Sequence, residues 1–431
     1  MNINLKKNST TRYFSFLSCA IALGVPAIAQ AAEEPVRGQG VLISNSKEFK
    51  PLGLHAGSFY FYPAIEIGVK QDSNVYRLPK ELERSDTIGT SKLSAAMESD
   101  WNRHELNARV SANLGYYDKY TDEDYQDYVA TAEGRLDVVK NSFATGRVGY
   151  KKLHEDRRSL DDRGSTKPTK FDRAYVGVGY DHKPNRLRTL VKLDYESLDY
   201  KNGTSVLGGA IDNDDRDRTR PEATIRLGYE NLPGKSLFIQ GEFYAVDYDK
   251  KLDNNGLERS STGYKVKAGL NFDLTSLLIG DVFVGYLGQN YDESSFTDIK
   301  DPLFGFGLSW YPTGLTTIYL DLDRFPSETT DPNAAGYLST VFSVQADHEL
   351  LRNLFLTGAL KYKDNKYQQL VPGVPGGKEN EDIFGADLGM KYLFNRRFYA
   401  TAEYKYERRN SDLERQEYKL NRGFLSLGAN W

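Results

Sequence analysis

Histidine is the residue type with which a catalytic interpretation of this sequence has to begin. The five histidines are His55, His104, His154, His182 and His348. Only His154, in the stretch KKLHEDRR, lies near the outer end of a predicted strand beside acids, Glu155 and Asp156. No two histidines have the spacing of zinc ligands, and the only cysteine is Cys19. The sequence therefore predicts no catalytic centre, metal site or cofactor, and a hydrolase with His154 at the rim of the fold is a less favoured alternative.

An acidic stretch, DNDDRD at residues 212–217, has some of the oxygen ligands of a calcium-binding loop. Arg216 stands where such a loop needs an oxygen ligand, and the required glycine and closing glutamate are missing. We therefore expect a solvated loop that binds cations weakly if at all.

Other charged residues recur at every second position of apolar segments. In YKVKAGLNFDL, residues 264–274, Lys265 and Lys267 alternate with Tyr264, Val266 and Ala268. Alternation with a period of two indicates a β-strand whose two faces meet different surroundings. If the apolar face meets lipid, the charged face lines a lumen, where side chains either pair with one another or tune what passes. The predicted lumen lining is Arg109, Glu133, Arg135, Lys192, Glu196, Arg226, Lys265, Lys267, Asp321, Asp323, Lys391, Glu403 and Lys405.

Alternating segments of about ten residues, the length of a membrane β-strand, follow one another from Ser58 to the C-terminus. Long polar loops between them alternate with tight turns at WNRH, VKNS, HKPN, NLPG, YPTG, LRN and FNRR. This pattern predicts an all-β protein, a transmembrane antiparallel up-and-down barrel of about 18 strands, with 16 as the alternative. The short turns are expected in the periplasm and the long loops outside the cell.

The last nine residues, GFLSLGANW, continue the alternation to the end of the sequence. Leu425, Leu427, Ala429 and Trp431 fall on one face, which we expect to meet lipid. We expect this strand to pair with the first one, because a barrel in lipid can leave no strand edge unpaired.

The beginning of the sequence has the features of a secretory signal peptide. Three cations, Lys6, Lys7 and Arg12, precede an apolar run, which ends at the small-residue exit AQA. We expect a signal peptide at 1–31, a periplasmic segment at 32–57 and the barrel at 58–431. Loss of the three cations changes the formal net charge from -4 to -7, a mild value that does not predict nucleic acid as a partner.

A motif-like stretch follows the first predicted strand, SFYFYPAIEIGVK. It consists of Asp72, Ser73, Asn74, Val75, Tyr76 and Arg77. With the Pro- and Gly-containing approach PLGLHAG, it resembles the bacterial outer-membrane barrel family called putative β-barrel porin 2. The alternative is that Asp, Ser and Asn simply turn the chain into the first outer loop. The resemblance implies a location in the bacterial outer membrane and, through its frequent association with exopolysaccharide systems, a role in polysaccharide export.

Three functions are therefore compatible with the sequence. The leading hypothesis is a non-enzymatic channel for polysaccharide export; the alternatives are a general or sugar-selective diffusion porin and, less favoured, the rim hydrolase. By resemblance, the export hypothesis implies a periplasmic polysaccharide-export protein and an inner-membrane copolymerase as partners. Outer-membrane lipid and the barrel-assembly machinery are the other expected partners. No loop is marked as a pore constriction, so a monomer is expected.

Overall fold

The structure, a computed structural model, describes residues 49–157, 162–274, 277–331, 333–369 and 380–431. The predicted signal peptide and residues 32–48 of the predicted periplasmic segment lie outside these ranges. In the part of the chain that the structure describes, no helix is long and apolar enough to cross a membrane.

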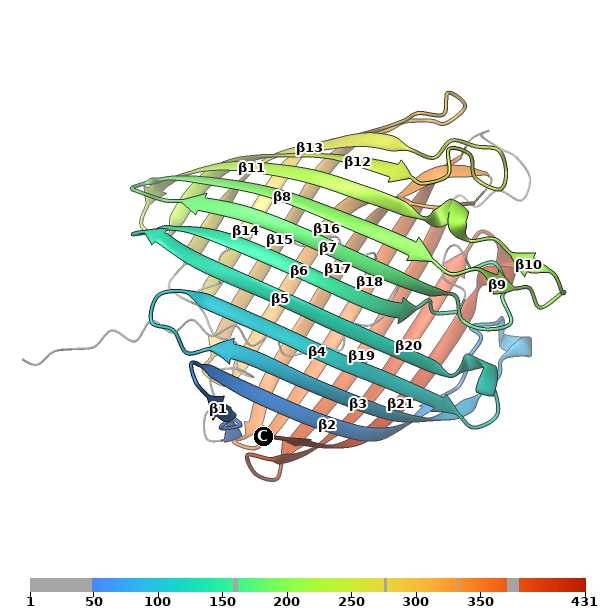
Figure 1. Ribbon diagram of the computed structural model, residues 1–431, viewed down its shortest axis with the longest axis horizontal. Coiled ribbons are helices and arrows are strands. Elements are labelled where there is room, and N and C mark those ends of the chain that lie inside the picture. Colours follow the sequence, from blue (N-terminus) through green and yellow to red (C-terminus); the bar gives the residue numbers. More distant parts are fainter. Residues whose placement is uncertain (1–48, 158–161, 275–276, 332, 370–379) are drawn as a thin grey trace, which may run out of the picture.

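Eighteen long strands form one antiparallel sheet in which each strand is hydrogen-bonded to its neighbours in the sequence. They are β2 (Phe59–Asp72), β3 (Asp86–Ser99), β4 (Glu105–Tyr117), β5 (Tyr125–Val139), β6 (Ser142–His154), β7 (Lys170–His182), β8 (Leu187–Tyr200), β11 (Arg218–Leu232), β12 (Lys235–Tyr248), β13 (Ser261–Leu274), β14 (Leu278–Tyr291), β15 (Ile299–Thr313), β16 (Thr316–Glu328), β17 (Ala334–Leu351), β18 (Leu354–Gln369), β19 (Asn380–Leu393), β20 (Phe398–Ser411) and β21 (Tyr418–Asn430). Strand β21 also pairs with β2, and this pairing closes the sheet into a barrel (Figure 1). The predicted 18-strand barrel is confirmed.

Three short strands lie outside the barrel wall. Strand β1 (Leu54–Ala56) pairs with the first residues of β2, while β9 (Gly203–Thr204) and β10 (Ala210–Ile211) form a small hairpin in the loop between β8 and β11. That hairpin projects from the end of the barrel opposite to β1 and the C-terminus (Figure 1). The two ends of the barrel therefore differ: one carries the longer loops and the other the short turns.

The closing seam joins the two ends of the barrel sequence in a regular register. Ile67 lies opposite Leu427 and Val69 opposite Leu425, and the Trp431 amide donates a hydrogen bond to the Pro63 carbonyl. Leu425 and Leu427 are 66% and 65% exposed, so the C-terminal strand presents its apolar side chains outward. In lipid this arrangement leaves neither edge of the sheet with unpaired backbone groups.

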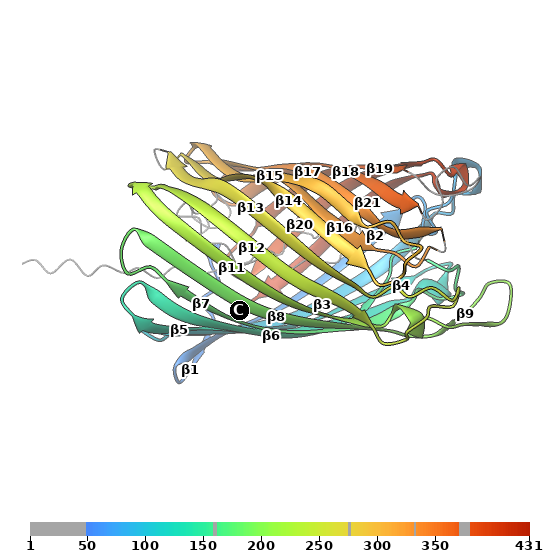
Figure 2. The ribbon, with the colours of Figure 1, turned by 90° about the horizontal axis from the view of Figure 1, so that it is seen from above.

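The connections differ in length at the two ends, as expected from the sequence. All seven stretches named as tight turns join strands at one end of the barrel. The connection between Leu274 and Leu278 contains no Asn, Gly or Pro, so the sequence does not mark it as a tight turn. The barrel is oval in cross-section: it is broad in the view of Figure 1 and narrower in the perpendicular view of Figure 2.

Aromatic side chains on the inner face of the wall lie over glycines of a neighbouring strand. Tyr175 lies directly opposite Gly149, and a methyl group added to Gly149 would overlap the Tyr175 ring. The same relation holds for Tyr125 and Gly115, Tyr244 and Gly263, Phe238 and Gly269, Phe283 and Gly305, and Tyr399 and Gly428. Because glycine has no side chain, each ring can lie against the wall instead of standing in the lumen.

Replacing Gly149 by alanine is expected to push the Tyr175 ring off the wall and to destabilise the barrel by about 1–3 kcal/mol, the usual effect of overpacking. The measurement is the urea midpoint of the detergent-solubilised barrel. Gly146→Ala on the same strand is the control, because nothing lies within 4 Å of a methyl group there. Equal midpoints for the two variants would contradict the role given to Gly149.

Candidate functional site: the lumen and its outer mouth

The strand register places the thirteen predicted lumen residues on the face opposite to the exposed apolar side chains. Lys265 Nζ lies 3.0 Å and Lys267 Nζ 3.5 Å from the two carboxylate oxygens of Glu242, a residue that the prediction did not include. Lys405 Nζ is 2.9 Å from Glu407 Oε2. Side-chain pairs of this kind make a hydrated wall with both signs of charge.

The remaining predicted residues are spread along several strands rather than gathered at one place. Arg135 Nε pairs with Asp137 Oδ1 at 2.9 Å, Glu196 pairs with Arg173, and Arg226 Nη2 donates to Asn271 Oδ1 at 2.8 Å. Cross-strand partners give the positions of the others: Arg109 lies opposite Thr131, Glu133 opposite Arg147, Lys192 opposite Gly179, Asp321 opposite Ser343, Asp323 opposite Val341, and Lys391 and Glu403 opposite Thr401 and Gly389. These residues form a lining and not a compact site.

The compact polar cluster lies instead at the outer mouth, where most of the buried charged side chains gather. Its first element is the stretch 72–77. Asp72 accepts hydrogen bonds from Arg422 on β21, with Nε and Nη2 at 2.9 and 2.6 Å. The Asn74 side chain, which is fully buried, donates to the Leu78 and Lys419 carbonyls and accepts from the Leu78 amide. The motif-like residues therefore anchor the β2–β3 loop to the last strand of the barrel.

Arg77 links this anchored loop to the loop between β6 and β7. It has a left-handed backbone (φ 51°), an uncommon conformation for a residue other than glycine, and its side chain is buried. Its Nη2 pairs with Asp156 Oδ1 at 2.9 Å and its Nη1 donates to the Arg157 carbonyl at 2.9 Å. The guanidinium also lies 6.0 Å from the centre of the Tyr418 ring on β21. We call this connection, made of Arg77, Asp156 and Tyr418, the mouth clamp.

The charge of Asp156 is maintained by the cations around it. Burial by itself would raise the pKa of Asp156, but Arg77, Arg422 and more distant cations outweigh burial and lower it. The carboxylate is therefore ionised at neutral pH, and its contribution to stability is lost only as the pH falls through this lowered pKa. Arg77 and Asp156 lie in outer loops, whereas Lys405 lies within β20 on the wall of the lumen, so the mouth clamp lies at the outer end of the charged lining.

Further ion pairs connect the β6–β7 loop to the loops on both sides. Arg157 makes a two-pronged pair with the buried Glu123 of the β4–β5 loop. Arg163 makes another with Asp215 of the β8–β11 loop, both distances being 2.9 Å. From that loop Arg216 returns to pair with Glu155. Two-pronged arginine–carboxylate pairs fix both distance and orientation, so these loops hold one another in place.

Arg259 makes an equivalent connection on the other side of the mouth. It is 1% exposed, pairs with Asp253 Oδ2 at 2.6 Å, and donates to the carbonyls of Thr329, Asp331 and Ala334 at 2.7, 3.0 and 3.0 Å. One side chain thus joins the β12–β13 loop to the β16–β17 loop. No constricting loop is expected from the sequence, whereas in the structure buried arginines join the outer loops.

In the two stretches considered for other chemistry, acidic side chains and His154 are engaged in ion pairs. His154 Nδ1 lies 2.8 Å from Asp127 Oδ1 and the ring stacks on Tyr125, and among the described residues no hydroxyl group is hydrogen-bonded to the imidazole. In the stretch 212–217, Asp212 pairs with Lys250 and Asp215 with Arg163. No cluster of metal ligands occurs among the residues that the structure describes.

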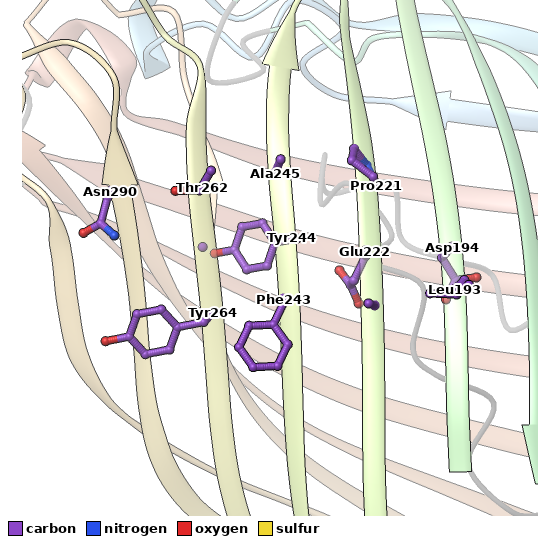
Figure 3. Close-up of a pocket in the computed structure, with 12 residues that line it drawn as sticks. Leu193, Asp194, Pro221, Glu222, Phe243, Tyr244, Ala245, Thr262, Tyr264 and Asn290 are labelled. Carbon is purple, nitrogen blue, oxygen red and sulfur yellow. The ribbon is translucent and has the colours of Figure 1, made fainter.

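A hollow of about 610 Å³ lies on the barrel wall and not in the mouth (Figure 3). Leu193, Ala223, Phe243 and Tyr264 form a row across four neighbouring strands, and Leu193 and Phe243 are exposed on the outer face. The small side chain of Ala223 leaves the depression between its larger neighbours. Because this face of the wall meets lipid, the hollow is not part of a path through the barrel.

The periplasmic end is narrowed by the first described residues. Phe49 packs against Phe355 and Leu393 on the inner wall, and Gly53, in a left-handed conformation, lies against the Tyr62 ring. Residues 49–53 therefore follow the wall from β18 and β19 to β2. The lumen runs between this segment and the mouth clamp.

Comparison with known families agrees with this architecture. The family model described as putative beta-barrel porin 2 matches residues 47–430. The chain belongs to this family. It is accordingly a porin-like β-barrel channel of the bacterial outer membrane. No curated protein matches the porin by sequence.

Solved structures with a similar course of the chain are distant. OpdK of Pseudomonas aeruginosa, solved with vanillate, is 11% identical, with 86% of this chain and 99% of that chain covered and a TM-score of 0.44. OpdO of the same organism is 12% identical, with 87% and 97% covered and a TM-score of 0.44. The siderophore receptor PirA of Acinetobacter baumannii is 8% identical, with 86% and 80% covered and a TM-score of 0.42. Likeness at this level assigns neither solute nor mechanism to the porin.

Replacing Arg77 by alanine is expected to open the mouth, because it leaves Asp156 without its nearest cation. Because the Asp156 side chain is 25% exposed, loss of its partner costs about 1–3 kcal/mol, enough to free the β6–β7 loop from the clamp. The measurement is single-channel conductance in planar bilayers, where we expect a larger and noisier current. Arg84→Ala is the control, since Arg84 is exposed and, among the residues that the structure describes, its side chain bonds only to the Leu82 and Glu83 carbonyls. Indistinguishable conductance of the two variants would refute the clamp.

The pH dependence of the mouth should reveal Asp217. Its burial, together with the charges of Asp199, Asp214 and Asp249, raises its pKa to about 6. Because this folded-state pKa lies above the unfolded value, ionisation destabilises the fold as the pH rises through about 6. We expect Asp217→Asn to raise the thermal midpoint at pH 7.5 and to leave it unchanged at pH 4.

The control is Asp212→Asn, whose wild-type carboxylate has a pKa lowered by Lys250. This variant should lose stability at pH 7.5, because a stabilising charge is removed. A fall in the midpoint of Asp217→Asn at pH 7.5 would show that the sign given to Asp217 is wrong.

Proposed function

We propose that this porin is a diffusion channel for small, hydrated, polar solutes. The observation that carries the proposal is the position of the mouth clamp above a wall of paired charges of both signs. Such a wall keeps its water and presents no single sign of charge, which suits polar solutes more than ions of one sign. The clamp limits the size of what enters, because it joins the β2–β3 loop to the β6–β7 loop across the intervening β4–β5 loop.

The test uses the purified porin in liposomes and sugars of increasing size. We expect swelling with mono- and disaccharides and little with larger oligosaccharides, while Arg77→Ala admits larger sugars than Arg84→Ala does. Liposomes that do not swell with any sugar would refute the proposal. The experiment reports solute size and so differs from the conductance measurement, which reports the open area for ions.

A conduit for polysaccharide export is the second candidate, and the rings on the inner wall favour it. Six aromatic side chains lie against glycines, so their faces are turned toward the lumen, where they offer flat apolar surfaces to sugar rings. This candidate requires the mouth clamp to open, and it implies the periplasmic export protein and the inner-membrane copolymerase as partners. The polysaccharide outside a deletion strain, compared with its complemented parent, distinguishes the two candidates: normal polymer would eliminate export.

A further inference from the structure

The periplasmic turns carry exposed cations almost without exposed acids. The exposed cations are Arg103, Lys140, Arg186, Lys235, Arg352, Arg396 and Arg397, and we call them the basic rim. Six of them belong to five of the eight connections at this end of the barrel, and Lys235 is the first residue of β12. Asp100 is the one exposed acid among the described residues of these connections. Solubility does not require a ring of charges of a single sign, because interspersed positive and negative side chains are sufficient for it.

The outer loops do not show this separation. Exposed Lys80, Arg84 and Lys119 are mixed with exposed Asp118 and Asp122 in the first two loops. The basic rim is therefore a property of one end of the barrel and not of the whole surface. A positively charged rim is suited to binding a negatively charged partner at that end of the barrel.

Two features indicate that this partner is the surface of the membrane around the barrel. The turns are short: the connection between β5 and β6 has only residues 140–141, and that between β11 and β12 only residues 233–234. A turn of this length cannot carry its cation far from the end of the strands. The cations also stand beside exposed apolar residues, which form the lower edge of the lipid-facing belt: Trp101, Val139, Leu187, Leu232, Leu351, Phe394 and Phe398.

We propose that the basic rim binds the anionic headgroups of phospholipids in the periplasmic leaflet of the outer membrane. Lys and Arg held at the level of the headgroups attract anionic lipid through charge, and the neighbouring apolar side chains contact the start of its acyl chains. The binding holds the barrel at a fixed depth and orientation. It does not depend on which solute passes through the lumen.

The test is native mass spectrometry of the full-length mature porin in detergent, with phosphatidylglycerol and phosphatidylcholine as probes. The rim variant is K140Q/R186Q/K235Q/R397Q, four exposed residues whose side chains make no hydrogen bond or ion pair with other described residues. The control is K80Q/K119Q/K251Q/K419Q, which removes the same charge from exposed positions at the outer end. Unheated gel mobility shows whether each variant is folded.

We expect the wild type and the control to retain phosphatidylglycerol in preference to phosphatidylcholine. The rim variant should lose this preference by roughly tenfold, in keeping with the attraction of several cations to an anionic surface. Sodium chloride should weaken phosphatidylglycerol binding to the wild type and leave phosphatidylcholine binding unchanged, because screening acts on charge; this measurement stands even if the rim variant does not fold. The proposal is overturned if the wild type shows no preference for phosphatidylglycerol over phosphatidylcholine, the result expected if the partner of the rim is an acidic protein. It is also overturned if the control loses the preference as much as the rim variant does.

Discussion

The backbone N–H and C=O groups of the membrane-spanning strands must all form their hydrogen bonds within the wall, because lipid offers no partner to an exposed strand edge. The pairing of β2 with β21 meets this requirement, with Ile67 opposite Leu427 and Val69 opposite Leu425. In the closed sheet the apolar face contacts lipid. The charged side chains of the strands must therefore form their ion pairs and hydrogen bonds in the lumen or at its ends.

The distribution of charge follows from that commitment. Along the wall, Lys265, Lys267 and Glu242 pair with one another beside water. At the outer end, where loops crowd together, arginines such as Arg77 and Arg259 lose almost all contact with solvent and instead bind carboxylates and carbonyl groups. An arginine can satisfy several acceptors at once, which makes it suitable for joining irregular loops.

The sequence was sufficient for the barrel and insufficient for the mouth, and the reason is physical. Alternation in a segment such as 264–274 records the contrast between lipid and lumen locally, residue by residue, and the tight turns carry their own Asn, Gly and Pro signals. The pair of Arg77 and Asp156 joins residues far apart in the sequence, and nothing near either residue indicates the other. Asp72 and Asn74 belong to a motif-like stretch of the sequence, but only the fold brings them to their partners on β21, Arg422 and Lys419.

The attachment of the β2–β3 loop to β21 has a consequence for the order of assembly. Asn74 hydrogen-bonds to the Lys419 carbonyl and Asp72 to Arg422, so the loop that bears Arg77 can adopt its final form only after the last strand has docked on the first. Completion of the wall and narrowing of its outer end are thus a single cooperative event. Before β21 pairs with β2, the wall has a gap and the outer mouth is wide. Once the two strands have paired, the outer mouth is already narrowed.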